Sequence, residues 1–350
     1  MTARPLRLAT YNVEWFNALF DDNGRMLDDR EPSTRYKTTR GEQLAALAIV
    51  FTALDADGIT IIEAPDTNGH RSTVKALETF ARATGLRARK AIIGYPSETE
   101  QEIAFLYDPD RLTARHDPQG LPSTTQGSHD APRFDTTFRY DLDADNISET
   151  IRFSKPPLEL AVTTSGGTHF RLIAVHAKSK NPYGAIGREA QIRLSIENRR
   201  KQLAQCLWLR QRVDGHLAAH DSLLVMGDFN DGPGIDEFEK LFGHSGIEIV
   251  LGTGPDPATR LTDPHAAMAL QSKVSACPTS ARFYLAPQKC YFEALLDFVM
   301  VSPDLAAKGP DWRIWHPFNE PHVTAVPELR EAILQASDHF PVSIDIPDVI

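Results

Sequence analysis

The sequence places polar side chains that could act on a metal or a phosphate directly after apolar segments. The clearest case is the mainly apolar run 222–226, which is followed by Gly227, Asp228, Phe229 and Asn230. A run of this length is typical of a strand buried on both faces, and the Gly, Asp and Asn after it indicate a loop. The carboxylate of Asp228 can hold a cation or take a proton from water, and the amide of Asn230 can donate to a phosphoryl oxygen. Asp-x-Asn is also common in turns, so this stretch alone does not establish a site.

The same arrangement recurs along the chain, with polar residues at or near the ends of apolar segments. In α/β folds the ends of strands gather at one rim, so residues far apart in sequence can converge on one cleft. Carboxylates, amides and histidines without cysteine favour Mg²⁺ or Mn²⁺ over a thiolate zinc site. Such a cation most often serves phosphate chemistry. The residues in this pattern are Asn12, Glu14, Glu63, His176, Asp228, Asn230, Asp297, Asp338 and His339.

Strands and helices alternate along the chain, which predicts an α/β fold. The first strand covers residues 6–12, a helix covers 38–55, a buried strand begins at Ile59, and a second helix covers 70–84. A run of apolar residues ending at Met226 adds a central strand. Further strands are predicted near residues 90–95, 102–107, 111–116, 136–141, 150–154, 158–164, 169–176 and 247–250, with a strand pair at 281–286 and 295–301 and a final strand after Pro341.

The strongest helix is predicted over residues 187–213, where Ile192, Ile196, Leu203 and Leu207 form one apolar stripe. On this interpretation Arg199, Arg200 and Lys201 belong to the solvated face of the helix and not to a nucleic-acid patch. Trp15 and Phe16 are interpreted as core residues. A short helix is expected near 235–242. Loops are expected at 17–34, 117–135, 252–280 and 317–327, where Pro, Gly and Asp are frequent.

Composition and charge narrow the class of protein. The chain has 350 residues and a formal net charge of −10, so it lacks the basic surface that loose binding to nucleic acid or anionic membranes requires. A bound divalent cation can still attract a phosphate to an acidic site. The three cysteines are too few and too scattered for a disulfide framework, which predicts free thiols in a reducing cytosol. No apolar run is long enough to span a membrane, and the first strand leaves no room for a signal peptide, so we expect a cytoplasmic protein.

Taken together, these motifs resemble the endonuclease/exonuclease/phosphatase superfamily, which includes deoxyribonuclease I, exonuclease III-type abasic endonucleases, inositol-polyphosphate 5-phosphatases and neutral sphingomyelinases. The resemblance spans nearly the whole chain, and the motifs occur in the family's order. It implies a single domain over residues 1–350, built as a four-layer α/β sandwich of two packed mixed β-sheets flanked by helices. The motifs that carry it are Asn12-Val13-Glu14, Ile62-Glu63, Val175–Ser179, Gly227–Asn230, Asp297–Val299 and Ser337–Val342.

The resemblance also implies which residues bind the metal. Glu63 corresponds to the principal ligand, and Asn12 lies beside it in the family pattern. Glu14 corresponds to a second candidate ligand, and Asp338 would help to bind metal or water. The implied cofactor is Mg²⁺ or Mn²⁺.

The implied catalytic group contains two carboxylates, an amide and two imidazoles. Asp228 would orient or deprotonate the attacking water, and Asn230 would hold a phosphoryl oxygen. His339 would lie against the scissile phosphate, paired with Asp297, and His176 would be a second imidazole facing the phosphate. Independently of the family, Asp297 lies within an apolar run, so its burial would require a polar partner.

Two departures from the family pattern leave the class of substrate open. Ile62 stands where the family often has Gln, and the residues after Glu63 are not the polar ones that nucleases often have there. Lys178 and Lys180 resemble a subgroup of bacterial members and are candidates for contact with the substrate phosphate. Lysines after a strand are also often simply solvated.

The sequence therefore predicts a metal-dependent phosphodiester hydrolase, with a nuclease as the first choice, that uses in-line attack of water without a covalent intermediate. The partner would be a phosphodiester, with nucleic acid the leading candidate, and no protein partner is implied. One alternative is a phosphatase or phosphodiesterase acting on a small phosphorylated metabolite or lipid headgroup. Another is a non-catalytic binding protein on the same scaffold. That last alternative predicts the loss of at least one of Glu63, Asp228, Asn230 and His339, and all four are present.

Overall fold

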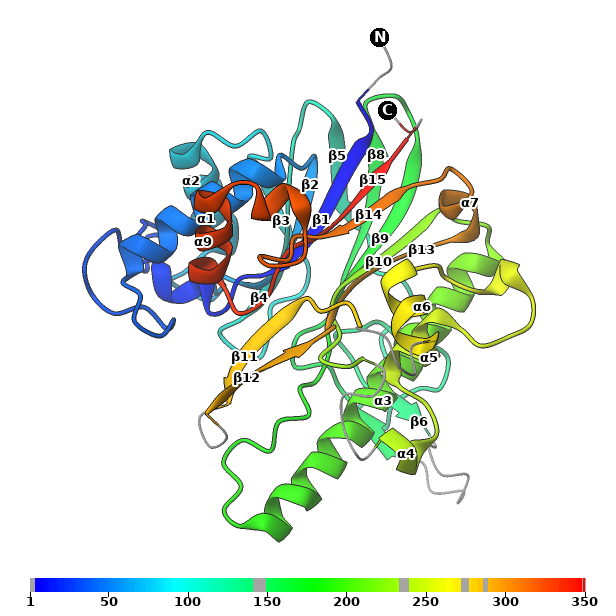
Figure 1. Ribbon diagram of the computed structural model, residues 1–350. Helices are drawn as coiled ribbons and strands as arrows, with labels where there is room; N and C mark the ends of the chain where they lie inside the picture. The colour runs from blue at the N-terminus through cyan, green and yellow to red at the C-terminus, as the bar shows by residue number, and fades with distance from the viewer. Residues whose placement is uncertain are drawn as a thin grey trace.

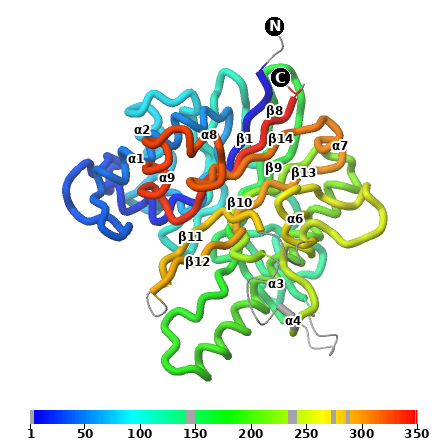
Figure 2. Tube along the Cα trace, in the orientation of Figure 1, coloured from blue at the N-terminus to red at the C-terminus, as the bar shows by residue number. Residues whose placement is uncertain are grey.

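Two mixed β-sheets pack face to face, and helices cover their outer faces (Figure 1). The computed structural model describes residues 4–140, 149–232, 239–271, 277–285, 289–347 and 349. The predicted four-layer α/β sandwich is confirmed. Figure 2 shows the start of β1 in blue and the end of β15 in red at the same end of the sandwich.

The first sheet joins the two ends of the chain. Its strand order is β14-β15-β1-β2-β4-β3. The strand β1 (Leu6–Asn12) pairs in parallel with β2 (Gly58–Ala64) and antiparallel with β15 (Val342–Ile346). The end of β1 therefore lies beside the start of β15, away from the chain ends. The remaining strands are β3 (Lys90–Ile93), β4 (Glu102–Tyr107) and β14 (Asp311–Ile314).

The second sheet has the order β13-β10-β9-β8-β5. Its strand β10 (Leu223–Asp228) is parallel to β9 (His169–His176) and antiparallel to β13 (Asp297–Val301). Every residue of β10 is buried, as the unbroken apolar run predicts for a strand covered on both faces. The other strands of this sheet are β5 (Leu112–His116) and β8 (Leu158–Thr164). Two further pairs of strands form separate two-stranded sheets. One pairs β6 (Phe138–Tyr140) with β7 (Glu149–Ile151), and the other pairs β11 (Ala281–Leu285) with β12 (Cys290–Ala294).

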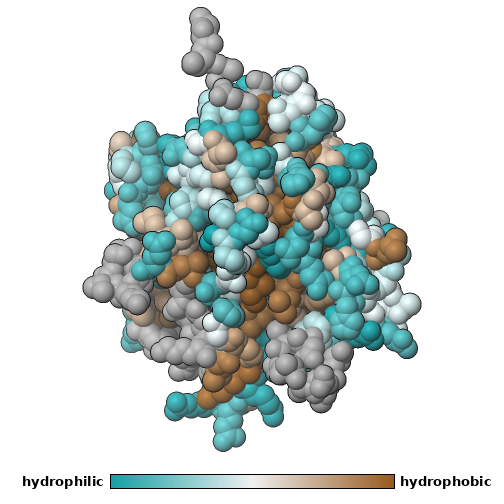
Figure 3. Space-filling model, turned by 90° about the vertical axis from the view of Figure 1, so that its right-hand side faces the viewer, coloured by the Kyte–Doolittle hydropathy of each residue, from teal (hydrophilic) through white to brown (hydrophobic). Residues whose placement is uncertain are grey.

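Helices form the two outer layers. The helices α1 (Arg40–Leu54), α2 (Thr73–Thr84) and α9 (Pro327–Ala336) lie on the side of the first sheet, and α3 (Arg188–Ala218) and α6 (Pro264–Gln271) on the side of the second (Figure 1). The face in Figure 3 is mostly hydrophilic, with hydrophobic residues gathered in a central band. Within the described ranges, no helix is both long and apolar enough to cross a membrane. The short helical segments are η1 (Phe16–Leu19), α4 (Glu239–Phe242), α5 (Gly246–Leu251), η2 (Pro257–Thr259), α7 (Pro303–Ala306) and α8 (Pro321–Thr324).

The helix α1 illustrates how local sequence sets the fold. The side chain of Thr39 accepts a hydrogen bond from the backbone of Glu42, and the side chain of Glu42 accepts one from the backbone of Thr39. This reciprocal capping box satisfies two backbone donors that a helix start otherwise leaves without partners. The apolar positions Leu44, Leu47 and Phe51 are buried in the core. The predicted helix over 38–55 is thus confirmed within two residues of each end.

Two predictions for residues 247–301 are wrong. The strand expected near 247–250 is the helix α5, because Ser245 and Glu248 form a capping box that starts a helix there. The strand 281–285 does not pair with 297–301. It pairs with 290–294 in the β11–β12 hairpin, whereas Asp297–Val301 joins the second sheet beside β10. The sequence prediction had left residues 290–294, the second strand of the hairpin, in the connection between the two predicted strands.

Several regular elements, among them α9, α6 and β14, lie where the sequence predicted loops or made no assignment. The helix α9 starts at Pro327, where proline occupies the first helical turn and costs no hydrogen bond, so this proline begins a helix and does not mark a loop. The helix α6 lies within the expected loop 252–280. The edge strand β14 had no prediction. The helix expected at 235–242 is described only over Glu239–Phe242, and the rest of it lies outside the described residues.

Two assignments of exposure are also corrected. Arg199 was assigned to the solvated face of its helix, but its side chain is 1% exposed and its Nη1 lies 3.4 Å from Asp231 Oδ1. A buried carboxylate on a neighbouring loop, invisible to helical periodicity, explains the difference. Phe16 is buried as expected, whereas Trp15 is 43% exposed. Cys206 is a buried free thiol, as the cysteine count predicted.

Gly227 on β10 lies too close to β9 to carry a side chain. Its φ is +139°, and a Cβ there would collide with the carbonyl oxygen of Val175 on β9. We expect Gly227→Ala to lower the free energy of unfolding by about 3 kcal/mol or more, because both the backbone and the neighbouring strand would have to shift. Urea denaturation measures this. Gly215→Ala in α3 is the control, since nothing lies within 4 Å of the added methyl group and alanine favours helix, and equal stability of the two variants would refute the expectation.

Glu102 predicts a pH dependence of stability. Its carboxylate is buried in β4 and accepts a hydrogen bond from the backbone of Ser97 at 2.9 Å. Burial raises the pKa of Glu102 from 4.5 to about 7. The folded protein therefore keeps a proton that the unfolded chain releases in this window, so the contribution of Glu102 to stability falls as the pH rises from about 4.5 to 7.

Replacing Glu102 with Gln removes that titration. Relative to the wild type, E102Q should be more stable at pH 8 than at pH 5 by about 3 kcal/mol, the amount that a shift of this size represents. Urea denaturation at both pH values gives the two differences in unfolding free energy. The same difference at pH 5 and pH 8 would show that Glu102 titrates normally.

Candidate active site

The register of the second sheet brings two of the predicted site residues next to Asp228. On β10, Asp228 stands directly beside His176 of β9 on one side and Asp297 of β13 on the other. In the first sheet, Asn12 ends β1 beside Ile62 of β2. The ends of these strands meet at one rim of the sandwich, as the sequence pattern predicted.

The carboxylate of Asp228 is the centre of a buried polar network. Its Oδ2 accepts hydrogen bonds from Asn12 Nδ2 at 3.0 Å and Asn230 Nδ2 at 3.2 Å, and its Oδ1 accepts one from Asn230 N at 2.7 Å. The Nε2 atoms of His176 and His339 lie 3.7 and 4.0 Å from Oδ2. Burial raises the pKa of Asp228 to about 7, although the charge of His339 opposes the rise. A carboxylate with such a pKa can accept a proton near neutral pH.

The second feature is a buried pair formed by His339 and Asp297. His339 Nδ1 lies 2.8 Å from Asp297 Oδ2, which also accepts a hydrogen bond from Ser280 Oγ at 2.8 Å. Burial alone would lower the pKa of His339, but the charge and hydrogen bond of Asp297 raise it well above its usual value. With Nδ1–H bound to Asp297, the ring presents an Nε2–H toward Asp228. The pair can therefore place a cationic donor at the rim.

His176 has the opposite electrostatic character. It is buried, and burial together with the charge of Lys155 lowers its pKa well below the usual value. Its Nε2 lies 3.4 Å from Lys155 Nζ. The site thus contains one neutral imidazole and one protonated imidazole on the two sides of Asp228.

An acidic group formed by Glu14, Glu63 and Asp338 lies beside this network. The Oε2 of Glu63 accepts a hydrogen bond from Trp15 N at 2.9 Å, and Glu14 Oε2 lies 2.6 Å from Arg35 Nη1. Burial raises the pKa of Asp338, and the charge of Glu63 adds to the rise. Burial likewise raises the pKa of Glu14, with a further contribution from Asp338. The charges of Glu14 and Glu63 thus each interact with Asp338, and the carboxylates offer oxygen ligands of the kind that a divalent cation prefers.

The backbone is strained at these residues. Glu14, Trp15, Glu63 and Asn230 have φ values of 20°, 57°, 60° and 49°, a region that residues other than glycine rarely adopt. Glu63 lies at an irregularity in the pairing of β2 with β4, between Ile62 and Ala64. Strained backbone that gathers at one place is typical of functional sites, because it costs stability and persists only where the surroundings enforce it.

Lys155 was missed by the sequence interpretation. Besides its contact with His176, its charge interacts with Glu63 and Asp228, while burial lowers its pKa. The direction of the strands indicates why Lys155 lies at the site. Lys155 precedes β8, which runs antiparallel to β9, so the start of β8 lies at the same rim as the end of β9. The sequence pattern considered polar residues that follow a strand, whereas Lys155 precedes one.

The two lysines proposed for substrate contact differ in their surroundings. Lys178 has a half-buried side chain, and its backbone N–H donates to Gln205 Oε1 at 2.8 Å. The ammonium of Lys180 lies 2.6 Å from the buried carboxylate of Asp231. Lys180 therefore stabilises the loop after β10, which gives it a structural partner that the sequence did not reveal.

Comparison with known proteins identifies the fold. No protein-family profile matches this chain, and no curated protein sequence does. Among solved structures, a humanized TDP2 from D. rerio with 14 mutations aligns over 99% of this chain and 100% of its own, with a TM-score of 0.52 and 12% identity. The chain has the endonuclease/exonuclease/phosphatase fold. Two structures from Bacteroides thetaiotaomicron, each 14% identical, also align over 98% of this chain. One is a mannosyl-6-phosphatase, which is covered over 100% of its chain with a TM-score of 0.49. The other is an endonuclease/exonuclease/phosphatase family protein, which is covered over 98% of its chain with a TM-score of 0.48.

Within this fold, the predicted site residues form two adjoining groups. Asp228, Asp297 and His339 offer ligand atoms that all lie within 4.8 Å of one another, so this buried cluster could hold a metal ion. Glu63 lies outside that cluster, in the acidic group beside it. The residues that contact Asp228 or pair with its neighbours are Asn12, His176, Asn230, Asp297 and His339, and those of the acidic group are Glu14, Glu63 and Asp338.

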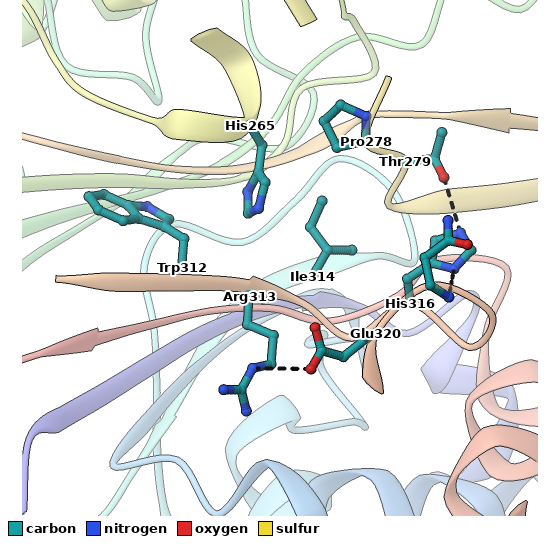
Figure 4. Close-up of a pocket in the computed structure, with 9 residues that line it drawn as sticks. His265, Pro278, Thr279, Trp312, Arg313, Ile314, His316 and Glu320 are labelled. Carbon is teal, nitrogen blue, oxygen red and sulfur yellow. Dashed lines mark hydrogen bonds and ion pairs between the residues drawn. The ribbon is translucent and has the colours of Figure 1, made fainter. Parts of the chain in front are cut away.

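A separate cavity of about 190 Å³ lies between α6 and β14 (Figure 4). Its wall includes His265 of α6, Trp312 and Arg313 of β14, and Glu320, whose Oε1 lies 3.7 Å from the guanidinium of Arg313. None of the residues described above for the Asp228 network or the acidic group lines it. The cavity is therefore distinct from the candidate active site.

Proposed function

We propose that this protein is a divalent-metal-dependent phosphoesterase that cleaves phosphodiesters, with nuclease activity as the first candidate. The observation that carries the proposal is the buried carboxylate of Asp228, which accepts from Asn12 and Asn230 and is flanked by His176 and His339. This arrangement supplies a base of suitable pKa beside cationic and neutral donors. We treat residues 1–350 as one domain, and the contiguous core shared by both sheets supports this.

Oxygen donors suited to Mg²⁺ or Mn²⁺ are present in the acidic group. We assign the cation to Glu63 and Asp338, with Asn12 beside them. Asn12 Oδ1 accepts a hydrogen bond from Glu14 N at 3.1 Å and keeps a second lone pair. When bound, such a cation would neutralise charge on the phosphoryl group during attack.

In the proposed reaction, Asp228 takes a proton from the attacking water. Asn12 and Asn230 fix the orientation of its carboxylate through their amide groups. Both amide hydrogens of Asn230 are engaged, one by Asp228 Oδ2 and one by the carbonyl of Ala177 at 3.1 Å. A direct bond from Asn230 to a phosphoryl oxygen would replace one of these, so its first role here is to position Asp228.

Positive charge within the site would stabilise the phosphoryl oxygens as negative charge develops. His339 supplies an imidazolium held by Asp297, and Lys155 supplies an ammonium at the start of β8. The Nε2 of His176 lies 3.4 Å from Lys155 Nζ and 3.7 Å from Asp228 Oδ2, so as a neutral imidazole it accepts from the ammonium in one tautomer and donates in the other. Donors fixed in advance of the reaction are effective because they need not reorganise during it.

A compact phosphate ester is the second candidate substrate. The net charge of −10 and the engagement of Lys180 by Asp231 favour it, because an extended nucleic acid needs several free cationic contacts along its backbone. Lys178 remains the proposed additional contact to the substrate phosphate. Substrate preference therefore separates the two candidates directly.

The first test is an activity panel with Mg²⁺ and with Mn²⁺ over plasmid, abasic DNA, RNA, bis-p-nitrophenyl phosphate and p-nitrophenyl phosphate. We expect hydrolysis of diesters, and a loss of about 100-fold or more in kcat for Asp228→Asn and His339→Gln, since each removes a group that acts in the transition state. Glu331→Gln, on an exposed part of α9, is the control. Unchanged turnover in both site variants would exclude the assignment, and activity on the monoester alone would exclude the nuclease.

The second test concerns Lys155. Lys155→Met should lower kcat/KM by about 10-fold or more through loss of the ammonium, and Lys155→Arg should restore part of it. Thermal unfolding should show K155M at least as stable as the wild type, because it removes a charge that burial disfavours. Equal kcat/KM in the wild type and K155M would assign Lys155 a purely structural role.

A further inference from the structure

The loop between η1 and α1 presents an arginine to the acidic group. Its last part is a tight turn in which Ser33 N donates to the carbonyl of Thr38 at 2.9 Å, and Arg35 N donates to Ser33 Oγ at 3.0 Å. An isolated bridge between Pro32 and Thr39 closes the turn immediately before α1. Arg35 therefore projects from an anchored turn and not from a free loop.

Two partners from distant parts of the chain hold the guanidinium of Arg35. Its Nη1 lies 2.6 Å from Glu14 Oε2, and its Nη2 donates to the carbonyl of Leu334 at 2.9 Å. Leu334 is in the last turn of α9, where the helix dipole places partial negative charge. Both side chains of the ion pair are 20% exposed, so water screens the pair only in part. The contact joins the N-terminal loop, the end of β1 and the C-terminal helix.

The charge of Arg35 reaches beyond Glu14, because the guanidinium also interacts with the carboxylate of Asp338. A fixed cation thus already occupies one side of the acidic group.

We infer that Arg35 divides the acidic group into two positions, one filled by its own guanidinium and one open to a single divalent cation. Glu14 belongs to the first position, because its Oε2 is in contact with Arg35. Glu63 and Asp338, with Asn12, form the second. This inference rests on the proposed function, and it proposes for Glu14 a role other than the metal ligand that the sequence resemblance implied. Repulsion from Arg35 lowers the affinity of the second position and prevents a second ion from binding at Glu14.

Direct measurement of Mn²⁺ binding to the full chain tests this inference without any substrate. Electron paramagnetic resonance of free Mn²⁺ and calorimetry give the number of ions and the Kd. We expect one Mn²⁺ in the wild type. Arg35→Gln should bind about tenfold more tightly and take up a second ion, because a carboxylate is released and a nearby cation is lost. Arg35→Lys, which keeps the charge, should stay within about twofold of the wild type.

Two further variants separate the role of Arg35 in metal binding from a role in folding. The double variant Arg35→Gln/Glu14→Gln restores the net charge, so it should again bind one ion with near wild-type affinity. If Glu14 were a ligand in the wild type, the double variant would instead bind more weakly. Arg40→Gln removes an arginine of the same region that contacts Asp29 outside the site, and should leave Mn²⁺ binding unchanged.

The outcomes distinguish this inference from the proposed function. Equal Kd and stoichiometry for R35Q and R40Q would overturn the inference, as would weak binding by the double variant. Glu63→Gln tests the proposed function separately, since it should weaken binding at least tenfold in any background. If E63Q binds as the wild type does, the proposed metal position fails, whatever the result for Arg35.

Discussion

The burial of the Asp228 carboxylate is the constraint on which the site depends. A buried carboxylate is stable only with donors around it, and those donors come from different parts of the fold. Asn12 ends a strand of the first sheet, Asn230 lies on the loop after β10, and His339 precedes β15. The two sheets must therefore pack in one relative position for the network to close. The packing that fixes the relative position of the two sheets therefore also fixes the side chains around Asp228.

The site holds opposite charges close together. The imidazolium of His339 interacts with Asp297, Asp228 and Asp338, and the charge of Lys155 interacts with Glu63 and Asp228. The charge of His339 does not fully offset the burial of Asp228, so the pKa of this carboxylate is raised to about 7. Charge placement thus sets the proton affinity of the proposed base.

Much of the fold and the centre of the site could be predicted because they depend on local signals. Buried strands read as apolar runs, and a polar residue after such a run, as at Asp228, marks the rim. The rest depended on tertiary contacts. Lys155 precedes a strand whose direction is set only by pairing, Arg35 comes from an irregular loop, and Arg199 is buried by a carboxylate from another segment. The predicted loop 317–327 ends at Pro327, which is in fact the first residue of α9. Proline is common both in loops and in the first turn of a helix, so its presence alone does not distinguish the two.

The pairing of β1 with β15 has a consequence for synthesis of the protein. These strands lie at opposite ends of the sequence, and the residues that surround Asp228 extend from position 12 to position 339. During translation β1 leaves the ribosome long before β15, so the edge of β1 that pairs with β15 stays unpaired until β15 has been made. Contacts of such long sequence separation form slowly, and exposed strand edges favour aggregation. The nascent chain therefore acquires its candidate active site only after β15 has left the ribosome.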